Sequence, residues 1–103
     1  MPSPLLAVGT AATDQAPIDG GPFWPPIHPD TCRDVMKLDG TVTNPRLRAA
    51  LITAIGHANT QLTTWATHQL DTGYPTLADV PAQQIDGTSL KVHQYRTAIY
   101  HLA

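Results

Sequence analysis

The five histidines are the first residues of this chain to consider for chemistry, because imidazole is the commonest metal ligand and a frequent general base. His57 and His68 are eleven residues apart in a segment with helical periodicity, which places them on one face but about 16 Å from each other. His93 and His101 are eight residues apart, whereas metal-binding helices use i, i+4 pairs. We therefore predict no histidine metal site.

The other candidate nucleophiles and acids form no catalytic constellation either. Cys32 is the only cysteine, which excludes an intramolecular disulfide, and no activating group lies near it in the sequence. Ser89 lies at an expected helix start, where capping explains it. Asp79 and Asp86 flank a connector, where Asp side chains commonly bond backbone N–H groups. We predict no catalytic, cofactor-binding or metal residues and no cofactor, and hence not an enzyme.

Length and composition predict one small domain with little charge. The chain has 103 residues, of which 42% are hydrophobic and 14% are charged, and its net charge is −2. Its six Lys and Arg residues are dispersed among eight acidic residues, all of them Asp. A protein that grips a phosphate backbone shows a basic stripe, so this composition argues against direct binding of nucleic acid.

No segment is predicted to cross a membrane or to act as a signal peptide. The N-terminal apolar run from Leu5 to Val8 is too short and has no basic region before it. We expect a protein made in the cytoplasm, without a membrane partner, that leaves only as part of an assembly.

Residues 1–22 are predicted to form a flexible N-terminal arm, and residues 23–103 a single helical domain. The arm is rich in Pro and Gly and shows no apolar period. Phe23, Trp24 and Ile27 then follow on a backbone stiffened by prolines. These side chains either fold back over the core or anchor a neighbouring subunit, since Trp is enriched at interface hot spots.

The rest of the sequence predicts an all-α fold, a small bundle of about three helices over residues 29–38, 45–72 and 88–103. The first two begin with a Pro, which suits a first helical position. Asp39-Gly40 is expected to end the first helix.

The second helix carries the longest apolar stripe. As one continuous helix it would span about 42 Å, with Asn44 as N-cap and Gly73 just beyond its end. We predict that Trp65 lies in the core or in a subunit seam. The stripe, at intervals of three and four, consists of Leu47, Leu51, Ala54, Ala58, Leu62, Trp65 and Gln69. The opposite face is polar but uncharged, which fits contact with another subunit.

Residues 74–87 are predicted to form an ordered, non-helical crossover between the second and third helices. Three apolar side chains should pin this connector onto the bundle, a Pro should stiffen it, and an Asp-Gly pair should turn the chain into the third helix. The residues concerned are Leu77, Val80, Pro81, Ile85, Asp86 and Gly87.

Two segments resemble the phage head completion protein family of contractile-tailed phages: "FWPPIHPDTCRDVMKLDGTVTNPRLRAALITAIGHANTQL" and "GYPTLADVPAQQIDGTSLKVHQYRTAIYHLA". The most specific element is the run from Leu77 to Ala82, followed by Ile85-Asp86-Gly87. Together the two segments lie within residues 23–103.

The resemblance implies a structural virion protein. Members of this family dock onto the portal vertex after DNA packaging, close the head as a ring and present a surface for the tail. The expected partners are the portal protein, copies of the chain in a ring (a dodecamer on a dodecameric portal), and tail-terminator or neck proteins, with packaged DNA only a neighbour in the channel. The expected location is the head–tail neck of the virion, after assembly in the host cytoplasm. Candidate residues for subunit or portal contact are Phe23, Trp24, Ile27, Arg46, Arg48, Thr60, Gln61 and Thr64.

A second hypothesis stays open on the residues alone. The chain could be a free-standing helical interaction domain that binds a partner helix in a groove.

Overall fold

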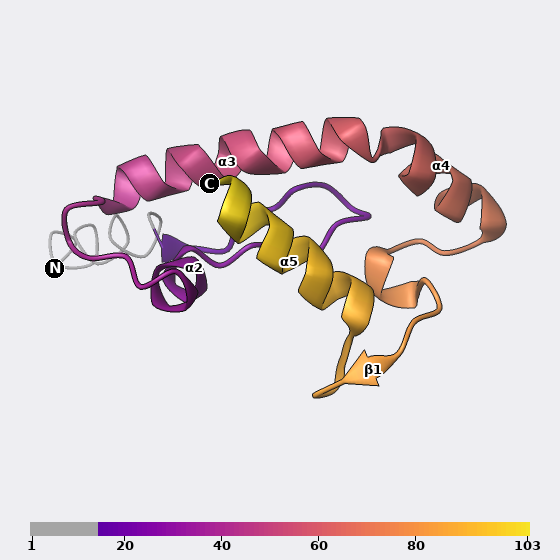
Figure 1. Cartoon of the computed structure of the whole chain (residues 1–103). Coiled ribbons are helices and arrows are strands. Elements are labelled where there is room, and N and C mark those ends of the chain that lie inside the picture. Colours follow the sequence, from indigo (N-terminus) through magenta and orange to yellow (C-terminus); the bar gives the residue numbers. More distant parts are fainter. Residues whose placement is uncertain (1–14) are drawn as a thin grey trace, which may run out of the picture.

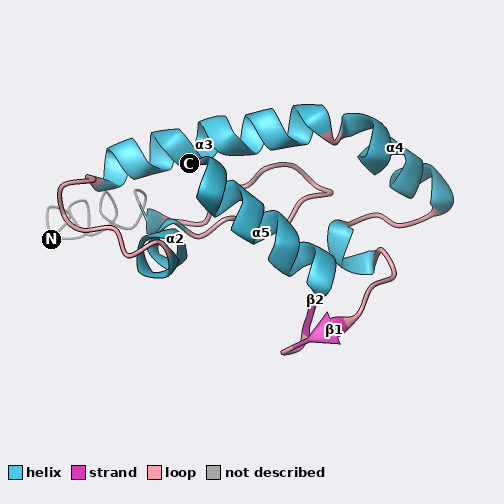
Figure 2. Cartoon of the chain, viewed as in Figure 1, coloured by secondary structure: helices cyan, strands magenta, loops and turns pink. Residues whose placement is uncertain are grey.

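The computed structural model describes residues 15–103, which form a mostly helical domain (Figures 1 and 2). Residues 1–14 of the predicted N-terminal arm lie outside the described part. The α-helices are α2 (Pro29–Val35), α3 (Asn44–Gln61), α4 (Thr63–Thr72) and α5 (Leu90–Leu102). A 3-10 helix, η1 (Leu77–Asp79), and a two-stranded hairpin, β1 (Gln84–Ile85) with β2 (Thr88–Ser89), lie between α4 and α5. The predicted all-α class is confirmed.

The core forms where α5 crosses α3 (Figure 1). Leu51 of α3 and Ile99 of α5 are both fully buried, and each element contributes residues at intervals of three or four. The buried apolar residues are Ile18, Phe23, Ile27, Cys32, Leu47, Leu51, Ala54, Ile55, Ala66, Leu77, Val80, Val92, Tyr95, Ile99 and Tyr100. The strap, α2, α3, η1 and α5 all contribute to this list, whereas α4 contributes only Ala66 and the hairpin strands contribute no apolar residue.

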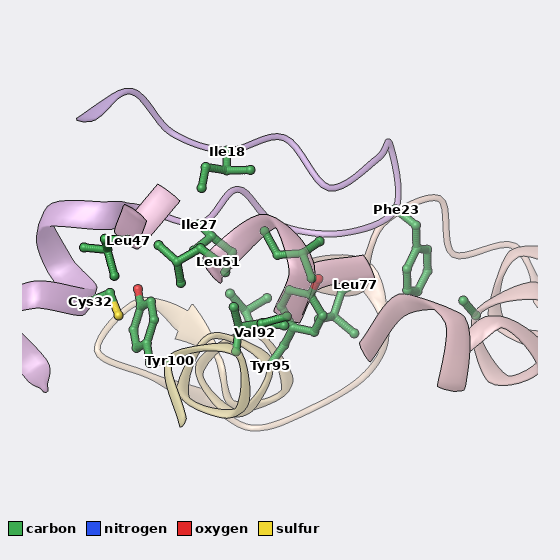
Figure 3. Packing of buried hydrophobic residues seen from close by; sticks show 14 of the residues in the cluster. Ile18, Phe23, Ile27, Cys32, Leu47, Leu51, Leu77, Val92, Tyr95 and Tyr100 are labelled. Carbon is green, nitrogen blue, oxygen red and sulfur yellow. The ribbon is translucent and has the colours of Figure 1, made fainter. Parts of the chain in front are cut away.

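A segment that precedes α2, residues 15–28, covers one side of this core, and we refer to it as the strap. Ile18 and Ile27 pair in an antiparallel bridge, with the Ile18 N–H 2.7 Å from the Ile27 carbonyl oxygen and the return bond at 3.0 Å. Ile18 is only 6% exposed and lies with the core side chains (Figure 3). The sequence analysis placed Ile18 in the flexible arm, so for this residue the boundary at residue 22 was wrong. The signal was missed because one isolated Ile among Pro and Gly has no period.

Helix α2 is shorter than the predicted span of 29–38. Pro29 lies at its start as expected, but the helix ends at Val35 because Lys37 adopts a left-handed conformation with φ 55°. The Lys37 N–H then bonds to the Asp34 carbonyl and the Leu38 N–H to the Arg33 carbonyl, which is the Schellman pattern. Glycine usually occupies this position, so the sequence pointed to the later Asp39-Gly40.

The predicted single helix over 45–72 is two helices that meet at an angle at Leu62 (Figure 1). Leu62 has φ −97° and ψ 6°, outside helical values, and the Thr63 hydroxyl donates to the Asn59 carbonyl at 2.8 Å. A Thr that bonds the carbonyl four residues back bends a helix. As a result the second half of the apolar stripe turns away from the core: Leu62 is 37% exposed, and Trp65 is half-buried rather than fully buried.

The helix termini show which local sequence signals predicted a helix end or cap correctly. Gly73 ends α4 in the left-handed region with φ 112°, and the Ser89 hydroxyl caps α5 by accepting from the Lys91 N–H at 3.2 Å. Asn44, by contrast, does not cap α3; its side-chain oxygen accepts a hydrogen bond from Arg33 at 2.9 Å. Among residues 15–103 no helix has the length and apolar character needed to cross a membrane.

Ile18→Ala should lower the free energy of unfolding by about 2–5 kcal/mol, because it removes a buried side chain and leaves a cavity under the strap. The matched control is Ile52→Ala on α3, where the side chain is 51% exposed, and its effect should stay within about 0.5 kcal/mol. Urea denaturation of both variants measures the difference. Equal effects would show that the strap does not belong to the cooperative core.

Candidate interaction surface

The connector, residues 74–87, is held to the core by two of its three expected anchors. Leu77 is 2% exposed and Val80 is 5% exposed, and the Leu77 N–H donates to the Phe23 carbonyl of the strap at 2.8 Å. Ile85, the third expected anchor, is 43% exposed, so this part of the prediction was wrong. Ile85 lies on a two-stranded hairpin that projects from the bundle. Its backbone pairs with Thr88 of β2, while its side chain stays exposed.

The hairpin turns at Asp86 and Gly87, as predicted. Both have positive φ, 54° and 73°, which matches the twist of a tight two-residue hairpin and explains the Asp-Gly pair. The His93 Nε2 lies 2.8 Å from the Ile85 carbonyl oxygen and ties the hairpin to α5. Pro81 is exposed and follows η1, where it restricts the backbone without contributing to the core.

The aromatic residues of the strap divide between core and surface. Phe23 is buried, whereas Trp24 is half-buried and stacks on Tyr95 of α5, with ring centroids 4.7 Å apart and 12° between planes. Trp24 also stacks on Trp65 of α4 at 6.5 Å. Beside these rings is a pocket of about 320 Å³. Of the candidate contact residues in the strap, Trp24 therefore remains accessible, while Phe23 and the fully buried Ile27 serve the protein's own core.

A chain of hydrogen bonds fixes the position of Tyr95 under this cluster. The Tyr95 hydroxyl donates to Asn59 Oδ1 at 2.6 Å, and Asn59 Nδ2 donates to the Gly20 carbonyl at 2.9 Å. The chain links α5, α3 and the strap. Burial raises the pKa of the Tyr95 hydroxyl to about 12, and the bond to Asn59 opposes the rise only in part.

The remaining candidate residues lie on α3 and α4. Arg46 is exposed, whereas Arg48 is half-buried and donates from Nη1 to the Ala16 carbonyl at 2.8 Å, so Arg48 holds the strap. Thr60, Gln61 and Thr64 are exposed together around the bend between the two helices. The accessible candidates are thus Trp24, Arg46 and the neutral group at the bend.

Reactive side chains do not gather on this surface. Within residues 15–103 no group of three His, Cys or Asp side chains could hold a metal ion. Cys32 is buried, and that burial raises the pKa of its thiol although Arg33 opposes the rise, which disfavours the nucleophilic thiolate. What this surface offers is aromatic and amide groups for contact with another protein.

A family model described as Phage head completion protein (GPL) matches residues 18–103.

The chain belongs to the phage head completion protein family.

The match begins at Ile18, the first buried residue of the strap, so the family region and the packed domain start at the same residue. The chain is also 37% identical over 106 residues to the head completion/stabilization protein of Escherichia phage P2. That alignment covers 98% of this chain and 63% of the relative, so the chain spans about three-fifths of the relative's length. No solved structure matches the chain. Both matches are thus to head completion proteins of phages.

Sequence reasoning missed two contributors to this surface. Asn59 was not singled out in the second predicted helix, and Gly20 lay within the predicted flexible arm. A signal existed for Asn59, which follows Ile55 by one helical turn and so faces the core, where an amide needs a partner. Gly20 gave no such signal, because its role depends on the strap returning to α3.

Val80→Asp should destabilise the domain by about 3–5 kcal/mol, because it places an unpaired charge between the connector and the bundle. The matched control, Ile85→Asp, puts the same charge on an exposed strand and should cost under about 1 kcal/mol. Thermal unfolding by circular dichroism compares the two. A cost for Ile85→Asp similar to that of Val80→Asp would restore Ile85 as an anchor.

The raised pKa of Tyr95 predicts a pH dependence of stability. Because the hydroxyl ionises at lower pH in the unfolded chain, its stabilising contribution is complete below pH 10 and is lost as pH rises toward about 12. The melting temperature should therefore fall over this interval. In Tyr95→Phe the fall should be smaller, and at neutral pH the loss of the bond to Asn59 should cost about 1–3 kcal/mol. An identical alkaline slope in Tyr95→Phe would contradict the assignment.

Proposed function

We propose that this head completion protein docks onto the portal vertex after DNA packaging, closes the head as a ring of copies and offers a surface to which the tail attaches. The observation that supports this proposal most directly is that residues 18–103 match the family model. On this proposal its partners are the portal protein, copies of itself in a ring that is twelvefold on a dodecameric portal, and tail-terminator or neck proteins at the neck of the virion.

A locked angle between helices supports the ring. Each copy in a closed ring must present the same wedge, because a small change in subunit angle prevents closure. Here the crossing of α3 and α5 is fixed from two sides, by the bonds from Asn59 to the strap and to Tyr95, and by the burial of Leu77 and Val80. The connector thus has a mechanical part in the proposed function.

The neutral group at the α3–α4 bend supports subunit or portal contact. Thr60, Gln61 and Thr64 are exposed, and the Gln61 side-chain nitrogen lies 3.1 Å from His57 Nε2. Interfaces are depleted in Lys, Asp and Glu, and this patch has none of them. Trp24 supplies an aromatic anchor of the type enriched at hot spots.

The double variant Gln61→Arg with Thr64→Arg should abolish or strongly reduce binding to purified portal rings, because each copy would bring two extra positive charges into a neutral contact. Mass photometry of the chain with and without portal measures occupancy, and circular dichroism confirms folding. Thr31→Arg on α2 is the matched control, since its side chain is exposed and α2 lies away from the α3–α4 bend (Figure 1), and it should bind normally.

Two results would count against the proposal. A wild-type chain that stays monomeric in the presence of portal rings would favour a free-standing interaction domain instead. Normal binding by the double variant would place the portal contact elsewhere on the surface.

A further inference from the structure

A second pocket lies beside Arg96, on a different part of the molecule from the α3–α4 bend. Its volume is about 450 Å³, and its walls come from the strap, η1, the hairpin and α5. We refer to it as the Arg96 pocket. Trp24, Pro25 and Val92 give it apolar walls, and Thr88, Ser89 and Arg96 give it polar groups.

Arg96 is the unusual member of this pocket. Its Nε is buried and has no hydrogen-bond partner among the described residues. A buried donor without an acceptor destabilises a protein, and such groups in native structures call for an explanation. The other half-buried arginines are paired: Arg33 donates to the Asp39 and Val42 carbonyls, each at 2.8 Å, and Arg48 donates to the Ala16 carbonyl. Arg96 Nε is therefore a buried donor that no acceptor among the described residues uses.

We propose that the Arg96 pocket binds a carboxylate side chain of a partner protein. A guanidinium presents Nε–H and one Nη–H in parallel, which matches the two oxygens of a carboxylate. Because Nε is covered in the free protein, the side chain turns toward the pocket on binding, and Nε then gains the acceptor it lacks. The Ser89 hydroxyl accepts from the Lys91 N–H, which leaves its own hydrogen to donate to the same ligand.

The pocket's composition favours an acidic side chain of a protein over a nucleic-acid phosphate. Its walls are largely aromatic, proline and aliphatic, surfaces that a peptide covers and a phosphate backbone does not. The chain carries a net charge of −2, so no basic stripe would hold a polyanion beside Arg96. The lining contains no Asp, and Asp79 on η1 already accepts from the Thr76 hydroxyl at 2.7 Å. This inference does not depend on the proposed docking to portal.

The test uses two blocked peptides as probes, acetyl-Leu-Glu-Leu-amide and acetyl-Leu-Gln-Leu-amide, titrated into the isotopically labelled chain. The Arg96 Nε–H resonance and the backbone amide of Ser89 are followed by NMR. The Glu peptide should shift both signals to saturation, and the Gln peptide should bind about tenfold more weakly or worse, because hydrogen bonds to a charged group are the stronger ones. Acetate and inorganic phosphate are titrated in parallel.

Four variants make the test specific. Arg96→Gln should lose discrimination between the two peptides, and Arg96→Lys should lose most of the affinity because it keeps the charge without the paired donors. Lys37→Gln removes one exposed positive charge outside the pocket and should leave binding unchanged. Ala78→Leu, at an exposed position on the pocket wall, should block entry with Arg96 intact, and it decides the matter if Arg96→Gln fails to fold.

Three outcomes would overturn the proposal. The first is equal affinity for the Glu and Gln peptides. The second is undiminished binding in folded Arg96→Gln or Ala78→Leu. The third is phosphate binding as tight as that of the Glu peptide, which would point to a general anion site. Because no portal is present, failure here leaves the portal proposal untouched.

Discussion

The whole structure depends on one geometrical constraint: two crossing helices cannot close a core by themselves. Where α5 crosses α3, the two helices meet over a short length and leave apolar surface open on both sides of the crossing. The strap closes this surface with Ile18, Phe23 and Ile27, and the connector does so with Leu77 and Val80, all of them buried. The bond from the Leu77 N–H to the Phe23 carbonyl joins the two covers. A domain of this size has little core to spare, so neither cover is dispensable.

The same crossing holds the principal polar contact inside the domain. A half-buried amide and a buried phenol would be costly if unpaired, but Asn59 and Tyr95 satisfy each other, and Asn59 also satisfies the Gly20 carbonyl. Gly20 lies close to α3: a Cβ at this position would lie 3.0 Å from the Ile55 Cγ2, so a larger residue would have to displace that side chain. Apolar packing alone tolerates sliding between helices, whereas these hydrogen bonds are formed in one register only. The contact therefore fixes the angle between α3 and α5 as well as contributing to stability.

What could be predicted from the sequence were features decided by a few neighbouring residues. Pro29 begins a helix, Gly73 ends one, Ser89 caps one, and Asp86-Gly87 makes a tight turn, each for a local reason. The failures have the opposite character. Lys37 takes a left-handed conformation that its type does not suggest, and Thr63 interrupts an otherwise regular stripe through one side-chain bond.

Residues whose role depends on distant partners were also missed or misplaced. Ile18 is buried only because Ile27 returns to pair with it, and Ile85 is exposed only because its strand projects in a hairpin. For the candidate surface, residue type suggested Trp24 and the neutral group on the second predicted helix, and these residues stay candidates. It could not separate Trp24 from Phe23 and Ile27, since adjacent side chains on an extended strap face opposite ways.

Two of the few basic residues of this weakly charged protein bind its own backbone and leave the surface largely neutral. Arg33 ties the turn before α3 to α2 through two backbone carbonyls and Asn44, and Arg48 ties the strap to α3. Charge in these places organises backbone within the domain and contributes little to the outer surface. Contacts made by the remaining aromatic and amide surface depend on shape more than on long-range attraction, so they are less sensitive to salt than an ionic interface would be.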